Sequence, residues 1–570
     1  MQQQISSSVR MLLKRGLISL SLIALVAPLA ADEKKKPLKI VFMMGQSNMV
    51  GYAAPRTAWY LTQPAYVPPA EVGKKTSKVF NWDHYWSGVR YASGDSEEYN
   101  AKGEALLKER EEIRGLWRSR YYANFSRAAK NGDKWNYKEW GEPPHKLERF
   151  KEMGMRNFMK IWLHEKAEEA GLYKRMEEYI ESPENKFHPG FAIAEIPKRD
   201  GYIAEDLKRV REIFLNGTKA EDFDKMAKAR EELLTQVNAE LKKNKQKRTS
   251  NPFKDRLEYA EFLKKNINHP IAERTYITAS GELRDDLVPE GKDSKRVNGV
   301  LTVGFGQNKG VSGPEYPFGI SFERMVDGPV LIVKCAVGGT SLNGNWRPTS
   351  LANAETPIEK AAREAAGKEK NIKLGPLWEQ AMAHIKEVLA DPGKFHPDYD
   401  PKAGVELAGL VWFQGWNDSG NKAYGEQFVH FIKDFRKEVN APELPVITGL
   451  MGHGAWKQTT FGTDPNKGML YAAQHPDLKG TVDIVNSLPY MPVELGLTWS
   501  AEKIFDKESK EAEMARTIKS RAVSKDGTHY FGSAKFVYLL GDAMARKLAN
   551  LHKGGKPTIH EEAQEILDKK

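Results

Sequence analysis

Short, nearly continuous apolar runs recur along the chain and are separated by charged segments. The first lies at residues 39–44, and four more follow at residues 330–334, 409–414, 445–450 and 482–487. Strands that are buried on both faces have this composition, because neither face of a parallel sheet contacts water. The pattern therefore predicts about five parallel strands.

Between and after these runs, apolar residues recur at the three-to-four spacing of amphipathic helices. Such segments are residues 356–366, 378–389, 427–439 and 533–551. Alternating strands and helices predict an α/β fold, in which helices cover both faces of a parallel sheet. Ligands of such sheets bind beyond the carboxyl ends of the strands, so the residues after each strand are the first candidates for function.

A charge-rich block at residues 81–269 interrupts this alternation. Helices are predicted within it at residues 104–118, 147–180 and 204–247. In the last of these segments Asn216 and Gly217 are expected to end one helix, and Thr218 is expected to cap the next. The block is therefore interpreted as a large helical insertion.

The chain is accordingly divided into four parts. They are a signal peptide (1–31), an α/β domain (32–80 and 270–552), the helical insertion (81–269) and a C-terminal tail (553–570). A length of 570 residues agrees with more than one folding unit.

The first part has the three regions of a secretory signal peptide. Arg10, Lys14 and Arg15 precede an apolar run, and small residues follow at Ala30 and Ala31. The run is shorter than the ~20 apolar residues of a membrane-spanning helix. We expect cleavage near Ala31 and a periplasmic or secreted protein without an integral membrane segment. An uncleaved membrane anchor is the alternative.

The composition excludes several classes of protein. The only cysteine, Cys335, excludes an internal disulfide and a zinc site of paired thiolates. The net charge is +11, but 87 basic and 76 acidic residues are interspersed, which argues against a nucleic-acid surface. No His-x-His or His-Glu-x-x-His pair is present, so neither a metal nor another cofactor is expected.

Residues that could take part in catalysis follow three of the predicted strands. The first strand leads into Gly45-Gln46-Ser47, where a serine on a tight turn would expose its hydroxyl and its amide. The second leads into Gly338 and Gly339, whose amides can approach a ligand closely. Taken singly, a serine here is more often a helix cap, and paired glycines more often form an ordinary turn.

Two further segments complete the pattern. Asn417 follows the strand that ends at Gln414, and its side-chain amide can donate to a developing negative charge. Asp526 lies three residues before His529, ahead of the last helix, so the carboxylate can hold one ring nitrogen while the other accepts a proton. A helix cap and a surface turn are the corresponding structural alternatives.

In this order, the motifs resemble the four sequence blocks of the SGNH hydrolase superfamily. Within it the chain is most similar to the sialate O-acetylesterase (carbohydrate esterase) family. The matching segments are Gly45-Gln-Ser-Asn-Met49, Gly313-Pro-Glu315, Gly338-Gly-Thr-Ser341, Trp412-Phe-Gln-Gly415 and Asp526-Gly-Thr-His529. The fold that this resemblance implies is a three-layer α/β/α sandwich with a flavodoxin-like strand order.

The resemblance also implies roles for individual residues. The catalytic residues would be Ser47 as nucleophile, His529 as general base and acid, and Asp526 as its orienting carboxylate. The oxyanion hole would be formed by Ser47, Gly338, Gly339 and Asn417. Substrate contacts would come from Gln46, Glu315, Gln414 and Trp416. Many relatives carry an acidic residue where this chain has Trp416.

The predicted function is removal of O-acetyl groups from a carbohydrate, either sialic acid or a plant, algal or microbial glycan, without a cofactor. One alternative is an acyl hydrolase of the same fold that acts on lipid or aryl esters. Another is a non-catalytic carbohydrate-binding protein, which would be expected to lack a member of the triad. Ser47, Asp526 and His529 are all present.

Overall fold

The structure is a computed structural model. It describes residues 35–64, 66, 89, 94, 96–117, 166–180, 182–185, 200–281, 296–365, 367, 373, 375–452, 464–492, 494–496, 498 and 508–558. The predicted signal peptide, the first part (147–165) of the helical segment predicted at residues 147–180 and most of the C-terminal tail lie outside these ranges. In the part of the chain that is described, no helix is long and apolar enough to span a bilayer.

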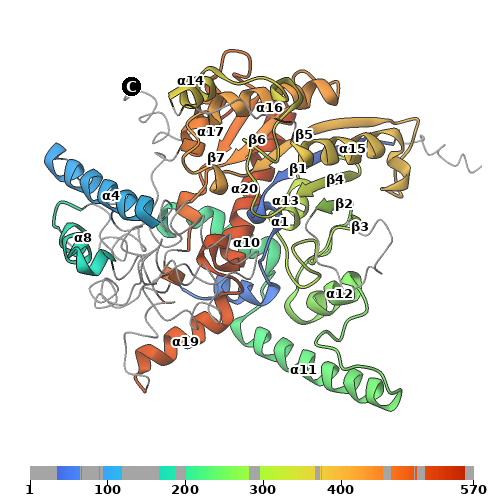
Figure 1. Ribbon diagram of the computed structural model, residues 1–570. Helices are drawn as coiled ribbons and strands as arrows, with labels where there is room; N and C mark the ends of the chain where they lie inside the picture. Colours follow the sequence, from blue (N-terminus) through green and yellow to red (C-terminus); the bar gives the residue numbers. More distant parts are fainter. Residues whose placement is uncertain are drawn as a thin grey trace, which may run out of the picture. The chain divides into compact units, whose positions relative to one another are not determined.

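Among the described residues, seven strands form one sheet in the order β3-β2-β4-β1-β5-β6-β7 (Figure 1). The strands are β1 (Leu38–Gly45), β2 (Thr275–Gly281), β3 (Arg296–Val300), β4 (Val330–Ala336), β5 (Val405–Phe413), β6 (Val446–Gly449) and β7 (Val482–Val485). Neighbouring strands are parallel, except that β3 is antiparallel to β2.

The five predicted strands are β1 and β4 to β7. Their order, β4-β1-β5-β6-β7, is the expected flavodoxin-like order, and the α/β fold is confirmed. Strands β2 and β3 extend the sheet beyond what the sequence predicted.

The described helices are, in chain order, α1 (Ser47–Val50), α4 (Glu97–Trp117), α8 (Leu172–Ile180), α10 (Ala204–Phe214), α11 (Ala220–Lys243), α12 (Arg256–Ile267), α13 (Glu315–Phe322), α14 (Pro357–Ala365), α15 (Pro376–Ala390), α16 (Tyr424–Glu438), α17 (Asp464–Gln474), α19 (Lys510–Ala522) and α20 (Ala534–His552). Short 3₁₀ helices include η1 (Pro55–Thr62), η3 (Thr349–Leu351), η4 (Pro392–Lys394), η5 (Trp416–Asp418), η6 (Leu488–Tyr490) and η7 (Gly527–Gly532).

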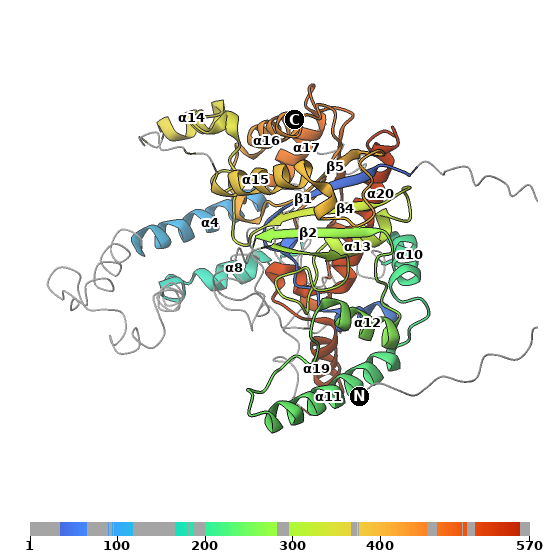
Figure 2. The same ribbon diagram turned by 90° about the vertical axis from the view of Figure 1, so that its right-hand side faces the viewer.

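Helices cover both faces of the sheet, as Figure 2 shows, with α15, α16 and α17 on one side and α13 and α10 on the other. On the first side Phe42 of β1 contacts Phe435 of α16, with ring centroids 5.2 Å apart. On the second side, α20 packs so closely on α13 that a Cβ added at Gly541 would lie 2.5 Å from Pro317. One continuous apolar core results.

The last part of the predicted insertion contributes to this core. Buried residues of α10, α11 and α12 belong to the same apolar cluster as the strands, for example Phe214, Phe223 and Leu263. Helices α4 and α8 pack on each other, with the rings of Tyr99 and Tyr179 stacked at 4.2 Å. The boundaries of the insertion as a separate folding unit therefore stay a prediction.

The predicted cap at Thr218 is wrong in detail. Helix α11 begins at Ala220, and the N–H of Lys219 donates to the carboxylate of Asp222 (3.0 Å). The Thr218 hydroxyl instead donates to the carbonyl oxygen of Ile267 at 2.7 Å. The hydroxyl joins two helices because a buried tertiary partner is available for it.

Candidate active site

Ser47 is the one residue between Leu38 and Ala53 that is not buried. It is the first residue of α1, so it does not cap that helix, and its hydroxyl has no hydrogen-bond partner among the described residues. The turn requires a glycine at position 45, because a Cβ there would lie 2.3 Å from the carbonyl oxygen of Phe413. This segment therefore presents a single free hydroxyl at the carboxyl edge of the sheet.

The Gln46 side chain joins this turn to two neighbouring strand ends. Its amide is oriented so that its NH₂ group donates to the carbonyl oxygen of Thr340 and to Oδ1 of Asn417, both at 3.0 Å. Its oxygen accepts from the N–H of Trp416 at 3.1 Å. Gln46 is fully buried, so these bonds fix the position of Ser47 relative to Asn417.

Asp418 holds the two loops that carry the expected oxyanion donors. Its Oδ2 accepts from the side-chain amide of Gln414 (2.6 Å) and from the N–H of Leu342 (2.8 Å). Its Oδ1 accepts from Asn421 (3.0 Å) and from the N–H of Asn343 (3.4 Å). Burial raises the pKa of the Asp418 carboxyl, and these donors oppose that shift. Sequence analysis missed this role, although the residue directly follows Asn417.

The expected oxyanion donors lie at the accessible edge of this network. Gly338 is partly exposed, and Gly339 is exposed with φ +71° and no atom within 4 Å of an added Cβ. Asn417 is exposed, and its oxygen is bound by Gln46, so its NH₂ group stays available to a ligand. This arrangement allows the donors to converge on an anionic oxygen.

His529 lies on the 3₁₀ turn η7, ahead of α20. Its Nδ1 lies 3.0 Å from Oδ1 of Asp526 and 3.1 Å from the Thr528 hydroxyl, which also binds Asp526. The hydrogen bond with His529 holds the pKa of the Asp526 carboxyl well below its usual range. Asp526 therefore stays ionised and orients the imidazole, which leaves Nε2 to exchange a proton.

The His529 turn is attached to the segment that follows Ser47. Asn48 donates to the carbonyl oxygen of Thr528 at 3.4 Å. The ring of Tyr52 packs against the imidazole of His529, with centroids 4.2 Å apart. Residues adjacent to the predicted nucleophile and the predicted base are thus in contact, although 480 positions separate them in the chain.

Three consecutive residues of this turn have left-handed backbone. The φ angles of Tyr530, Phe531 and Gly532 are +50°, +61° and +57°. Such angles are costly for aromatic residues. The N–H groups of Ser524 and Lys525 bind the carbonyl oxygen of Phe531 (2.8 and 3.1 Å), and the Tyr530 hydroxyl accepts from the N–H of Gly452 (3.1 Å). These bonds stabilise the conformation that presents His529.

Glu315 lies beneath the site and is completely buried. Its carboxylate binds the ammonium group of Lys334 (2.8 Å) and the N–H of Gly313 (2.8 Å). Lys334 also donates to the carbonyl oxygen of Val50 at 2.9 Å, at the end of α1. Glu315 therefore supports the Ser47 turn from below.

The other predicted substrate contacts differ in exposure. Gln46 and Gln414 are fully buried, and protein groups bind their side-chain amides. Trp416 is partly exposed beside Asn417 and packs on the core. Direct contact of these residues with substrate, like that of Glu315, stays a prediction.

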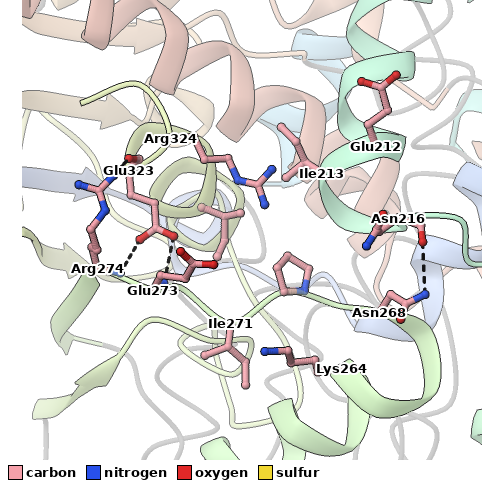
Figure 3. Close-up of a pocket in the computed structure, with 12 residues that line it drawn as sticks. Glu212, Ile213, Asn216, Lys264, Asn268, Ile271, Glu273, Arg274, Glu323 and Arg324 are labelled. Carbon is pink, nitrogen blue, oxygen red and sulfur yellow. Dashed lines mark hydrogen bonds between the residues drawn. The ribbon is translucent and has the colours of Figure 1, made fainter. Parts of the chain in front are cut away.

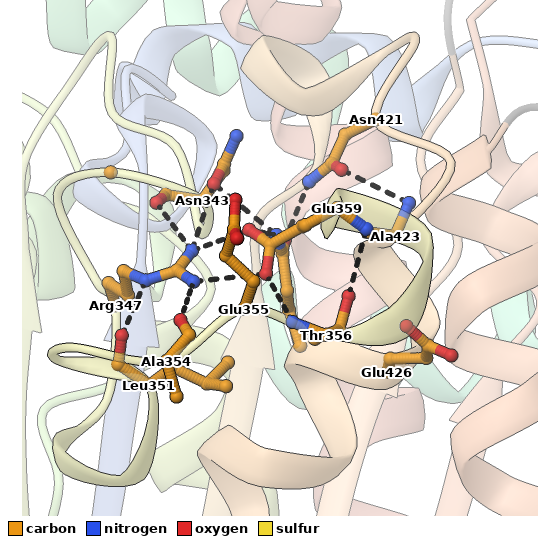
Figure 4. A network of polar contacts seen from close by, with 12 residues as sticks. Asn343, Arg347, Leu351, Ala354, Glu355, Thr356, Glu359, Asn421, Ala423 and Glu426 are labelled. Atoms are coloured by element: carbon orange, nitrogen blue, oxygen red, sulfur yellow. Dashed lines mark hydrogen bonds and ion pairs between the residues drawn. The ribbon is translucent and has the colours of Figure 1, made fainter. Parts of the chain in front are cut away.

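A cavity of about 780 Å³ adjoins Asn417. It is lined by α14 on one side and by residues 417–423 on the other. Figure 4 shows the polar network at its base, in which Arg347 donates to both carboxylate oxygens of Glu359 (2.6 and 3.0 Å). The polar lining and the position beside Asn417 are suitable for a sugar ring.

A second cavity, of about 560 Å³, lies far from these residues (Figure 3). Arg274, which lines it, directly precedes β2, so the cavity is at the amino ends of the parallel strands. The predicted catalytic residues follow the carboxyl ends. In the described ranges, no cluster of three His, Cys, Asp or Glu residues could hold a metal ion.

Residues 291–487 match a family described as carbohydrate esterase, sialic acid-specific acetylesterase. The resemblance to sialate O-acetylesterases is confirmed, and the protein is a carboxylic ester hydrolase. The matched segment contains Gly338, Gly339 and Asn417, whereas Ser47 and His529 lie outside it.

Parts of the chain are also similar to solved structures. A protein from Arabidopsis thaliana is 16% identical over 44% of this chain and 82% of its own, with a TM-score of 0.23. A carbohydrate acetylesterase from Xanthomonas citri is 18% identical over 30% of this chain and 34% of its own, with a TM-score of 0.20. NanS is 12% identical over 38% of this chain and 69% of its own, with a TM-score of 0.26. With TM-scores this low, these structures are not used to assign a fold or a function. No curated protein matches the chain.

Proposed function

We propose that the protein is a serine esterase that removes O-acetyl groups from a carbohydrate, with Ser47, His529 and Asp526 as its triad. The main support is the accessible hydroxyl of Ser47 at a strand end, together with an imidazole that a carboxylate orients on the turn contacted by Tyr52. The contact of Asn48 with Thr528 joins the two parts of the site.

Acylation begins when Ser47 attacks the acetyl carbonyl carbon and His529 Nε2 takes its proton. The ionised Asp526 stabilises the imidazolium that forms. The carbonyl oxygen becomes an oxyanion, which accepts hydrogen bonds from the amides of Ser47 and Gly338 or Gly339 and from the Asn417 side chain.

The oxyanion then collapses, and the bond from the acetyl carbon to the sugar oxygen breaks. His529 returns its proton to this oxygen, so the sugar leaves as an alcohol and the acetyl group stays on Ser47. Water, deprotonated by His529, then attacks the acetyl-enzyme and releases acetate. No step requires a redox partner or a second substrate other than water.

The proposed substrate is an acetylated glycan outside the cytoplasm. The family match supports the carbohydrate class, and the expected signal peptide at residues 1–31 supports export to the periplasm or medium. The cavity beside Asn417 offers room for a sugar next to the expected oxyanion donors.

The test is release of acetate from a panel of acetylated sugars by the wild type and by Ser47→Ala. The variant is expected to lose activity by a factor on the order of 10⁶ while its melting temperature stays unchanged, because the hydroxyl has no structural partner. Ser350→Ala is the control, since the Ser350 hydroxyl lies 2.9 Å from Nδ1 of His430 and this serine–histidine pair is not part of the predicted triad. Comparable turnover by Ser47→Ala would refute the proposal.

A further inference from the structure

Residues 338–347 follow β4, carry the two glycines of the expected oxyanion hole and are here called the glycine loop. Within the loop, the indole N–H of Trp346 donates to the Thr340 hydroxyl at 2.9 Å. Trp346 is 1% exposed, and Thr340 directly follows Gly339. Because the indole is buried, this bond joins the end of the loop to its beginning, so a displacement at Arg347 is passed on to Gly339.

Arg347 attaches the end of the glycine loop to helix α14 (Figure 4). Its guanidinium donates to both carboxylate oxygens of Glu359 (2.6 and 3.0 Å) and to the carbonyl oxygen and Oδ1 of Asn343 (3.3 and 3.1 Å). Burial opposes ionisation of Glu359, but the bonds from Arg347 and from the N–H of Thr356 hold the pKa of its carboxyl below the usual value. The result is an ionised, bidentate pair that fixes the loop against the helix.

Gln427 of α16 links the same carboxylate to the loop by a second route. Its NH₂ group donates to Oε1 of Glu359 (2.6 Å) and to Oδ1 of Asn343 (3.3 Å). Its oxygen accepts from the side chain of Asn421 (2.7 Å), which also donates to Asp418 (3.0 Å). Glu359 therefore belongs to the hydrogen-bond network of Asp418, the carboxylate that holds both loops with expected oxyanion donors.

A second carboxylate of the same cavity offers a comparison. Glu355 also lines the cavity, its side chain is 9% exposed against 12% for Glu359, and it also pairs with an arginine, Arg363, at 2.8 Å. Arg363 lies on α14 itself. The Glu355 pair therefore joins neighbouring positions of one stretch of chain, whereas the Glu359 pair joins α14 to the glycine loop.

We propose that Glu359 is a positioning residue of the esterase, which acts through Arg347 to hold the glycine loop where its amides meet the developing oxyanion. The inference rests on the proposed function and adds a residue outside the predicted triad and oxyanion hole. Oxyanion donors are effective when they are in place before charge develops. A shift of about 1 Å in such a group can reduce the rate by about 10².

The experiment compares the wild type with Glu359→Gln and Glu355→Gln, each of which removes one charge and keeps the shape of the side chain. The substrates are an acetylated sugar and nitrophenyl acetate, which has no sugar to fill the cavity. Because both carboxylates line the cavity, an effect of lost charge on sugar binding is common to the two variants.

For nitrophenyl acetate, kcat is expected to fall about ten- to thirtyfold in Glu359→Gln and less than about threefold in Glu355→Gln, with KM changed by less than about twofold. The pH profile should keep its shape, because Asp526 and His529 are unchanged. A similar loss of kcat is expected with the acetylated sugar.

Methylboronic acid provides a readout that a purely structural role would not change. It forms a tetrahedral adduct with a serine hydroxyl and so resembles the transition state. Its Kd for Glu359→Gln should rise by the same factor by which kcat falls. A residue needed only for folding would reduce the amount of active enzyme and leave this Kd unchanged.

The double variant Arg347→Gln/Glu359→Gln covers the case in which Glu359→Gln does not fold, because it leaves no unpaired buried charge. Its matched control is Glu355→Gln/Arg363→Gln. The same changes of kcat and Kd are expected for this pair of variants.

The inference is overturned if Glu359→Gln and Glu355→Gln have equal kcat and equal Kd for methylboronic acid. It is also overturned if the loss appears only with the sugar, because Glu359 would then be a substrate contact. If the wild type releases acetate from no sugar, the proposed function fails. Amide hydrogen exchange of residues 338–347 then tests the positioning separately: faster exchange in Glu359→Gln than in Glu355→Gln supports it, and equal exchange overturns it.

Discussion

The two sides of the candidate site are built differently. On the side of Asn417, the supporting side chains of Gln46, Gln414 and Asp418 are at most 3% exposed. Gln414 donates to Asp418, and Gln46 binds the Asn417 side chain and the backbone of Thr340 and Trp416. On the side of His529, the supporting Asp526 side chain is 53% exposed and belongs to a short surface turn.

This difference separates two physical requirements. The oxyanion donors must already be in place before charge develops, which a buried network on strand ends ensures. The imidazole needs a carboxylate partner that stays ionised, and a turn at the surface keeps the Asp526 carboxylate solvated. We therefore expect substitutions in the strand-end network to change stability and rate together, and those in the turn to change rate alone.

Asp526→Asn tests the turn and, among the substitutions around the nucleophile, is expected to have the largest effect. An amide cannot stabilise the imidazolium, so kcat should fall by about 10³–10⁴. The melting temperature should stay close to that of the wild type, because the carboxylate is mostly exposed. A large loss of stability would show that the turn is as structural as the strand ends.

The pH dependence follows from the same carboxylate. Its folded pKa is lowered, so the bond to His529 is fully present above the ordinary value of about 3.9 and is lost only as the pH falls through the lower folded value. Chemical shifts of the His529 ring should report this bond still intact at about pH 4. Loss of the bond at higher pH would contradict the assignment.

Asn417→Ala tests the strand-end side and should lower kcat by about 10²–10³ with little change in KM. The reason is that the amide would contact the oxyanion in the transition state rather than the ground-state ester. Steady-state kinetics on a small acetate ester would measure this. A change confined to KM would make Asn417 a substrate contact instead.

Asp418→Asn should change both properties. The NH₂ group of the new amide would face an N–H group that now donates to the carboxylate, such as that of Leu342. Two donors would then oppose each other. We expect unfolding free energy to fall by about 1–3 kcal/mol and kcat by about tenfold, as the oxyanion donors shift. Denaturant unfolding and kinetics would measure these, and an unchanged stability would show that the network is not what holds the loops.

Asn48→Ala should have the smallest effect. Its 3.4 Å bond to Thr528 is long, and the Ser524 hydroxyl also holds the turn through the carbonyl oxygens of Tyr52 and Gly532 (2.6 and 2.8 Å). A two- to fivefold reduction of kcat, equivalent to about 0.4–1 kcal/mol, is expected. A reduction above a hundredfold would mean that this one bond aligns the two sides.

The sequence predicted the central strands because they are continuous apolar runs. It missed β2, in which Thr275 and Thr278 interrupt the apolar residues and Thr278 binds the buried side chain of His384 (2.9 Å). Partners of this kind are distant in the chain, and so the sequence did not reveal that Thr278 is buried.

The same limit applies to the site. Turn composition and motif order were enough to nominate Ser47 and Asn417, both of which the structure places at the edge of the sheet. The ion pair of Lys334 with Glu315 and the bonds from the N–H groups of Leu342 and Asn343 to Asp418 join groups that are distant in the chain and are brought together by the sheet. Whether the nominated residues carry out the chemistry stays a prediction.

The central position of β1 has a consequence for how the protein is made. Lys39 pairs with Val330 on one side and with Glu406 on the other, so the first strand to leave the ribosome has no neighbours until most of the chain has followed. Contacts of such long sequence separation form slowly. The apolar β1 therefore stays unpaired until β4 and β5 have been made, so the turn of Ser47 is completed late in folding.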